Sequence, residues 1–174
     1  MKQHVKILVL GDDGVGKSSL ICTLISQHFS ERDIPAVHVD VSIPAEATED
    51  GVHVTILDSS QSTPMAELTR KICEADSIIL VYDIQRRETL DNLMDYWLPL
   101  LKQILPDPLA SPTVILAGNK VDVRTDGGGR SEIDPAPRNS RDDVKPLLEK
   151  FKERVWARFE CSAKFYLGIE EVFY

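Results

Sequence analysis

Short runs of apolar residues alternate with longer amphipathic segments along this chain of 174 residues. A run such as Ile78–Val81, which contains no polar residue, is typical of a strand buried on both faces of a sheet. The longer segments repeat their apolar positions with the period of a helix. The pattern predicts strands at residues 5–10, 37–43, 52–57, 77–82, 113–117 and 155–161, and helices at 18–27, 64–75, 88–104, 142–154 and from 168 to the end.

This alternation of strands and helices predicts an α/β domain with a mostly parallel sheet and helices on both faces. One pair of strands, 37–43 and 52–57, resembles a hairpin with its turn at Glu49-Asp50-Gly51. The segment Arg124–Arg141 interrupts the alternation with three consecutive glycines and two prolines among charged residues. That composition predicts a flexible insert loop at the surface of a single domain spanning residues 1–174.

The composition is that of a soluble globular protein, with 43% apolar and 28% charged residues. A net charge of −8 argues against nucleic acid or anionic lipid as a partner held by the general field of the protein. No apolar run approaches the roughly 20 residues of a membrane span, so we expect no direct membrane contact. Cys22, Cys73 and Cys161 lie in apolar surroundings and are predicted to be buried, reduced thiols. Trp97 and Trp156 are predicted to pack in the core or under the fourth helix, with contact to a partner as the alternative.

The segment Gly11-Asp12-Asp13-Gly14-Val15-Gly16-Lys17-Ser18 fits the phosphate-loop pattern G-x-x-x-x-G-K-[ST] between a predicted strand and a predicted helix. Glycines allow backbone amides to approach and surround a phosphate. Lys17 supplies a positive charge for the β- and γ-phosphates, and the Ser18 hydroxyl is a suitable ligand for Mg²⁺. The alternative is a glycine-rich turn capped by Ser18. The predicted phosphate-contacting residues are Asp13, Gly14, Val15, Gly16, Lys17, Ser18 and Ser19.

The segment Asn119-Lys120-Val121-Asp122 follows a buried strand and predicts selectivity for guanine. The Asp122 carboxylate can accept hydrogen bonds from N1–H and the 2-amino group of guanine, a pair of donors that adenine lacks. Lys120 can lie along the purine and reach a loop carbonyl, while Asn119 can join this loop to the phosphate loop. Taken alone, such a segment is usually a polar turn. Its position about 100 residues after a phosphate loop favours the base-binding role.

Two further segments complete the predicted site. Ser162-Ala163-Lys164 follows the last strand, where the Ala163 amide can donate to guanine O6. Ser162 can cap the following helix instead of, or in addition to, this role of the segment. Asp58 follows the strand at 52–57 and is predicted to be a partner of Mg²⁺ from outside its inner ligand set, through water or through the Ser18 ligand. The alternative is an ordinary turn aspartate. Ser59 is also predicted to contact the nucleotide.

These motifs, in this order, resemble the Ras superfamily and, within it, the N-terminal GTPase domain of the mitochondrial Rho (Miro) family. Val41–Glu46, Tyr96–Leu100, Glu160–Ala163 and Glu171–Tyr174 carry the finer likeness. The resemblance implies a six-stranded sheet with one antiparallel pair, and GTP or GDP with Mg²⁺ as cofactors. It also implies a longer parent with EF-hands, a second GTPase domain and an anchor in the mitochondrial outer membrane, which would act with adaptors or effectors of mitochondrial transport. Because the chain stops at Tyr174 within a predicted helix, we expect a fragment of such a protein.

The chain departs from the Ras pattern where hydrolysis is controlled. Ala36 stands where a threonine closes on Mg²⁺, and Asp13 stands where many relatives have glycine beside the γ-phosphate. Gln61 falls at the glycine and Ser62 at the glutamine of Asp-x-x-Gly-Gln, whose glutamine orients the attacking water. With Lys17 and Gln61 as the catalytic candidates, we expect slow hydrolysis.

The motifs and their departures are compatible with three functions. One is a GTPase switch whose effector contacts change with the γ-phosphate. Another is a constitutively GTP-bound scaffold that binds adaptors, which Ala36 and the displaced glutamine favour. A nucleotide kinase would share the phosphate loop, but it predicts an arginine-rich lid and no N-K-x-D segment, so it is disfavoured.

Overall fold

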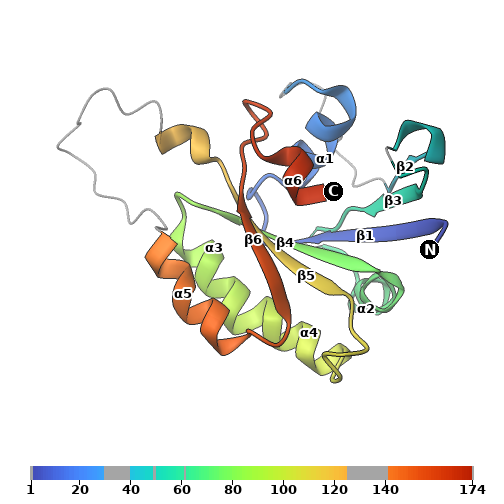
Figure 1. Cartoon of the computed structure of the whole chain (residues 1–174). Helices are drawn as coiled ribbons and strands as arrows, with labels where there is room; N and C mark the ends of the chain where they lie inside the picture. Colours follow the sequence, from blue (N-terminus) through green and yellow to red (C-terminus); the bar gives the residue numbers. More distant parts are fainter. Residues whose placement is uncertain (1, 30–39, 49, 61, 125–140, 174) are drawn as a thin grey trace.

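The computed structural model describes residues 2–29, 40–48, 50–60, 62–124 and 141–173. Within these ranges six strands form one sheet in the order β2-β3-β1-β4-β5-β6 (Figure 1). Only the β2–β3 pair is antiparallel. The fold class predicted from the sequence is therefore confirmed. The strands are β1 (His4–Leu10), β2 (Val41–Ile43), β3 (His53–Leu57), β4 (Ser77–Asp83), β5 (Thr113–Asn119) and β6 (Val155–Glu160).

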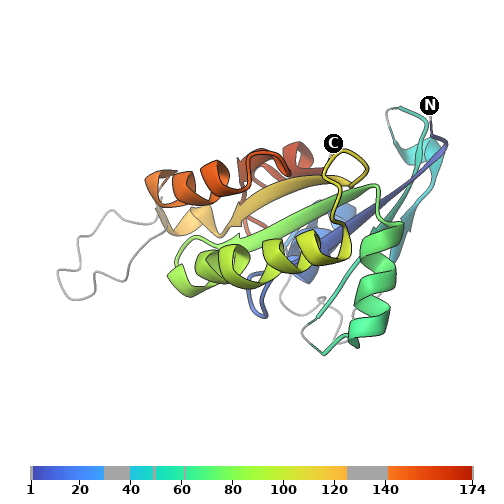
Figure 2. The same cartoon turned by 90° about the horizontal axis from the view of Figure 1, so that it is seen from below.

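Helices cover both faces of the sheet. Helices α1 and α6 lie on one face (Figure 1), while Figure 2 views the opposite face, where the continuous α3–α4 helix lies between α2 and α5. The helices are α1 (Lys17–Ser26), α2 (Met65–Glu74), α3 (Arg87–Asn92), α4 (Leu98–Ile104), α5 (Arg141–Lys150) and α6 (Ile169–Phe173).

Side chains of the central strands point alternately to the two faces of the sheet, and this divides the core into two parts. In β1, Ile7 and Val9 belong to the cluster under α1 and α6, whereas Leu8 and Leu10 belong to the cluster under α2 to α5. Successive side chains of a strand point to opposite faces, so a strand that is apolar throughout contributes to both clusters. Packing on both faces holds the central strands in place, and these strands position the loops that follow their carboxyl ends.

The long helix predicted at 88–104 is continuous but contains a π-helical turn, η2 (Leu93–Trp97), between α3 and α4. Such wide turns are uncommon and occur frequently near functional sites. The helix predicted at 142–154 ends earlier, at Lys150. The turn that follows is held by Arg154, whose Nη2 donates to the Leu105 carbonyl at 2.7 Å.

The predicted hairpin is present as the antiparallel β2–β3 pair, but its connection contains a short 3-10 helix, η1 (Ala45–Ala47). The prediction of a turn confined to residues 49–51 was therefore too simple. Residues 37–39 and Glu49 lie outside the described residues, as does nearly all of the predicted Arg124–Arg141 loop. The flexibility of that insert stays a prediction.

Three predictions of burial were wrong. Cys73 is exposed and Cys22 is only half-buried. Cys73 follows Ile72 on α2, and one residue turns a helix by about 100°, which carries Cys73 away from the core. Trp156 is 84% exposed on the edge strand β6, where the side chain faces away from the core. Cys161 is buried as predicted, and burial raises the pKa of its thiol to about 12.

Among the described helices, none combines the length and the apolar character needed to cross a membrane.

Candidate nucleotide-binding site

The predicted motifs meet at the carboxyl ends of the parallel strands. β1 leads into the phosphate loop, β3 ends before Asp58, β5 ends at Asn119, and β6 leads to Ser162. Because these strands run in the same direction, their following loops lie at one edge of the sheet, where open α/β folds bind their ligands.

Gly16 allows the phosphate loop and the Asn119 loop to come together. It adopts a φ of 96°, which is a left-handed conformation, and a Cβ atom there would lie 2.4 Å from Asn119 Nδ2. A side chain at this position would therefore separate the two loops. Asn119 Nδ2 donates to the Val15 carbonyl at 2.9 Å, which confirms the predicted connection between them.

Lys17 is buried inside the phosphate loop. Its Nζ donates to the carbonyl oxygens of Gly11 at 2.9 Å and Asp12 at 2.8 Å, and lies 4.0 Å from Asp13 Oδ1. Burial lowers the pKa of Lys17, and the nearby carboxylates partly offset this effect. A phosphate group would favour the charged amine in the same way, because an opposite charge stabilises a buried cation.

Ser18 and Asp58 place two hard oxygen ligands side by side. The Ser18 hydroxyl donates to Asp58 Oδ2 at 2.7 Å, and Oδ1 accepts from the Ser59 amide at 2.8 Å. Behind them, the buried Lys71 donates to the Asp58 carbonyl at 2.8 Å and to Asp40 Oδ1 at 2.9 Å. Within the described ranges no group of three or more His, Cys, Asp or Glu residues could hold a metal ion. The pair fits Mg²⁺, which takes few protein oxygens and completes its shell with water and phosphate.

The base-recognition segment is attached to the phosphate loop at a second point. Lys120 Nζ donates to the Gly14 carbonyl at 2.7 Å and forms an ion pair of 2.8 Å with Asp83, a carboxylate that is almost completely buried. The sequence predicted that Lys120 would reach a loop carbonyl. It did not predict Asp83, which comes from the end of β4 and holds the Lys120 amine in place.

Ser162 orients the carboxylate expected to recognise guanine. Its hydroxyl donates to Asp122 Oδ1 at 2.6 Å and accepts a 3.3 Å hydrogen bond from the Phe165 amide. Since α6 begins only at Ile169, the alternative prediction that Ser162 caps the last helix was wrong. The Ala163 amide donates to Asn119 Oδ1 at 3.3 Å, so its contact with guanine O6 stays a prediction.

A cavity of about 390 Å³ lies between these loops. Phe29, which was not predicted from the sequence, lines it beside predicted residues from both loops. An aromatic side chain in this position can stack on a base, but its signal in the sequence is only a lone Phe after the first helix. The lining residues are Gly14, Gly16, Ser19, Phe29, Asn119, Lys120, Asp122, Ala163 and Lys164.

Other predicted residues lie outside this cavity. Val15 is fully buried beneath the loop, and the Ser59 hydroxyl donates to the Val9 carbonyl at 2.8 Å. The Asp13 side chain is 63% exposed. Gln61 and Ala36 fall outside the described residues, so their proposed parts in hydrolysis stay predictions.

Comparison with known families identifies the fold. The sequence matches the Ras family over residues 6–174. The chain belongs to the Ras family.

It is 40% identical over 172 residues, 98% of its length, to a Mitochondrial Rho GTPase 1 from Cryptococcus neoformans. It is 35% identical over 173 residues, 99% of its length, to the protein of the same name from Arabidopsis thaliana. These alignments cover 23% and 24% of the relatives, so the chain spans about a quarter of their length. The expected resemblance is confirmed, and it supports a GTPase.

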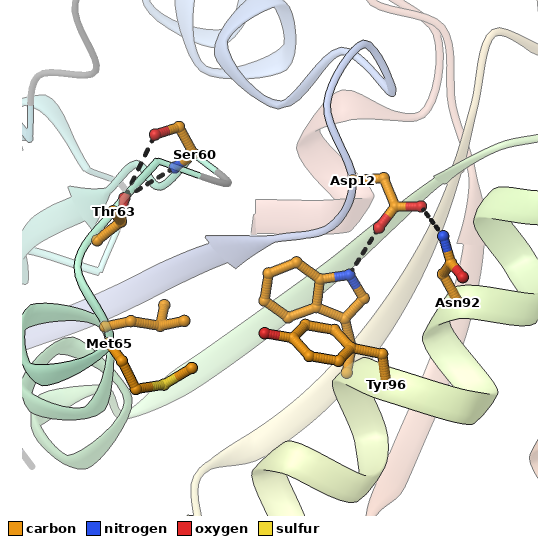
Figure 3. Close-up of a pocket in the computed structure, with 8 residues that line it drawn as sticks. Asp12, Ser60, Thr63, Met65, Asn92 and Tyr96 are labelled. Atoms are coloured by element: carbon orange, nitrogen blue, oxygen red, sulfur yellow. Dashed lines mark hydrogen bonds between the residues drawn. The ribbon is translucent and has the colours of Figure 1, made fainter.

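This Ras-family domain has a second cavity, of about 440 Å³, between α2 and the π-helical turn η2. Figure 3 shows Asp12 at its edge, with one carboxylate oxygen accepting from Trp97 Nε1 at 2.9 Å and the other from Asn92 Nδ2 at 2.7 Å. Trp97 is buried as predicted, and it also connects the start of the phosphate loop to the long helix. Met65 and Tyr96 lie at the rim, each about half exposed.

Proposed function

We propose that this Ras-family domain binds GTP and GDP with Mg²⁺ and hydrolyses GTP slowly. The observation that carries the proposal is the joining of two predicted motifs around one cavity. Asn119 and Lys120 donate to the carbonyls of Val15 and Gly14, while Asp122 lies in the wall of the same cavity. A phosphate-binding loop and a carboxylate suited to guanine are thereby within reach of one ligand.

Mg²⁺ fits the pair formed by Ser18 and Asp58. The Ser18 hydroxyl would bind the ion directly and Asp58 would bind it directly or through water. When bound, the ion would neutralise charge on the β- and γ-phosphates. Lys17 would add a second positive charge on the protein side of the phosphates.

At the level of the parent protein, we propose a domain of a mitochondrial Rho-type GTPase that controls mitochondrial transport and morphology from the outer membrane. The names of the relatives support the mitochondrial assignment. Their length supports the view that residues 1–174 are one domain of a longer chain. Adaptors or effectors would then contact this domain from the cytosolic side.

A constitutively GTP-bound scaffold is the second candidate. Ser62 favours it, because its short side chain bonds to Ser60 Oγ at 2.7 Å, whereas a water-orienting glutamine would extend toward the γ-phosphate. In that case the nucleotide would be structural, and adaptor binding would not depend on turnover.

The nucleotide that co-purifies with the protein tests the central proposal. It is released by denaturation and identified by chromatography. We expect a guanine nucleotide. GTP would favour the scaffold, GDP would favour a working hydrolytic cycle, and ATP would refute guanine selectivity.

We expect intrinsic hydrolysis to be slow, on the order of 10⁻³ s⁻¹ or less, as in Ras-type proteins without an activating partner. Gln61→Ala should change this rate by less than about tenfold, because Gln61 is displaced by one residue from the position that orients water. Single-turnover hydrolysis of GTP is measured for the wild type, Gln61→Ala and Ser62→Gln, with Gln103→Ala on the exposed face of α4 as the control. A hundredfold loss in Gln61→Ala alone would show that Gln61 positions the water.

A further inference from the structure

Three consecutive carbonyls of the phosphate loop accept hydrogen bonds from side chains outside the loop. The Asp13 carbonyl accepts from Arg86 Nη1 at 3.2 Å, in addition to the contacts of Gly14 with Lys120 and Val15 with Asn119. A trans peptide is planar, so its N–H points opposite to its C=O. The three donors therefore turn the amides of Gly14, Val15 and Gly16 away from themselves, toward the other side of the loop.

The amides of Gly14, Val15 and Gly16 donate no hydrogen bond to an acceptor within the described part of the protein. Backbone amides without partners are rare, and successive ones around glycines at positive φ form binding sites for anions. Gly14 and Gly16 have φ values of 76° and 96°. Gly14 and Gly16 also line the cavity of about 390 Å³, so a ligand in that cavity could supply the missing acceptor.

Arg86 reaches the loop from a different element than Asn119 and Lys120. It lies in the turn between β4 and α3, where its amide donates to the Asp83 carbonyl and its own carbonyl accepts from Thr89. Arg86 Nε pairs with Glu88 at 2.9 Å, which leaves the Nη1 edge of the guanidinium directed at the loop. A Cβ atom on Gly14 would lie 3.3 Å from Nη1, so glycine also leaves room for this approach.

We propose that Arg86 is a positioning residue for the nucleotide phosphates. Its cation holds the Asp13–Gly14 peptide with the Gly14 amide directed at the phosphates, and withdraws electron density from the carbonyl, which makes that amide a stronger donor. Because Arg86 lies on the carbonyl side, it acts through the peptide and does not contact the phosphates. The inference rests on the proposed binding of GTP and GDP.

The rate of GDP release tests this role. We expect Arg86→Ala to release a fluorescent GDP analogue about five- to twentyfold faster than the wild type in the presence of Mg²⁺. Arg86→Lys retains a charged donor. On a logarithmic scale, its release rate should therefore lie at least halfway back from that of Arg86→Ala to that of the wild type. Arg87→Ala is the matched control, since Arg87 is the adjacent arginine of similar exposure and pairs with Asp91 and Asp143. It should change the rate less than twofold.

A second measurement separates positioning from general support of the fold. In the GDP-bound protein, Arg86→Ala should move the Gly14 amide proton upfield and shift the β-phosphate ³¹P resonance, with a melting temperature close to that of the wild type. Arg86→Gln replaces Arg86→Ala if the latter unfolds. GDP release from Arg86→Ala within twofold of the wild-type rate, or an equal acceleration in Arg87→Ala, would overturn the role of Arg86 and leave the proposed function standing. Absence of saturable GDP binding by the wild type would instead overturn the proposed function and the inference with it.

Discussion

We expect Lys17→Ala to weaken the binding of GTP and GDP by at least about a hundredfold. The Lys17 amine is buried within the loop and already lies between carbonyl oxygens, close to the amides that would surround a phosphate. A hydrogen bond to a charged group contributes about 1.5–3 kcal/mol, and a polyphosphate offers more than one acceptor. A hundredfold loss corresponds to about 2.7 kcal/mol, which two such contacts readily exceed.

Calorimetry with Mg²⁺ measures this loss. Lys102→Ala is the matched control, because Lys102 is an exposed lysine on α4, and it should bind as the wild type does. Removing the amine also leaves the carbonyls of Gly11 and Asp12 without this donor, so the melting temperature of each variant is recorded without nucleotide. Affinity within tenfold of the wild type in a folded Lys17→Ala variant would contradict the assignment of the phosphate loop.

The sequence predicted those parts of the structure that depend on local patterns. Apolar runs such as Ile78–Val81 in β4 predicted a sheet covered on both faces. The phosphate loop was recognisable because glycine, lysine and serine each serve a local requirement at fixed spacing. The same is true of Asn119, which was expected to contact the phosphate loop, and of Lys120, which was expected to reach a loop carbonyl; both donate to carbonyls of the phosphate loop.

The remaining features depend on contacts between distant segments. Arg86 contacts the phosphate loop, and Asp83 contacts Lys120. Both contacts arise because β4 lies between β1 and β5 in the sheet. Asp12 accepts a hydrogen bond from Trp97, which lies 85 residues later in a π-helical turn. The sequence pattern did not predict that turn. Burial of single side chains was also misjudged where one residue decides the face, as with Cys73 on α2 and Trp156 on β6.

The acidity of the chain gives these local contacts their importance. With a net charge of −8, the general field opposes a polyphosphate ligand. In the proposed function the anion is therefore held by nearby groups, which are Lys17, the amides of Gly14, Val15 and Gly16, and Mg²⁺ bound at Ser18. In the same proposal, selectivity for the base is a separate property, because it depends on hydrogen bonds from the base to Asp122, which lines the cavity.

We expect Asp122→Asn to change base selectivity from guanine toward xanthine. The carboxylate would accept from N1–H and the 2-amino group of guanine, whereas an amide keeps one acceptor and offers one donor, which matches N1–H and the 2-oxo group of xanthine. A bidentate match to a base is worth about 1–3 kcal/mol. Losing one match and gaining the other should lower the ratio of GTP to XTP affinity by at least about thirtyfold.

The structure makes this substitution a clean test, because asparagine has the same shape as aspartate and its carbonyl can still accept from the Ser162 hydroxyl, which bonds Asp122 at 2.6 Å. Competition of GTP and XTP for the same protein measures the ratio directly. Asp95→Asn makes the same chemical change on the exposed face of the π-helical turn and should leave the ratio unchanged. An unchanged ratio in Asp122→Asn, with GTP still bound tightly, would remove Asp122 from the base site. Equal loss of both nucleotides would instead assign Asp122 to holding the loop through Ser162.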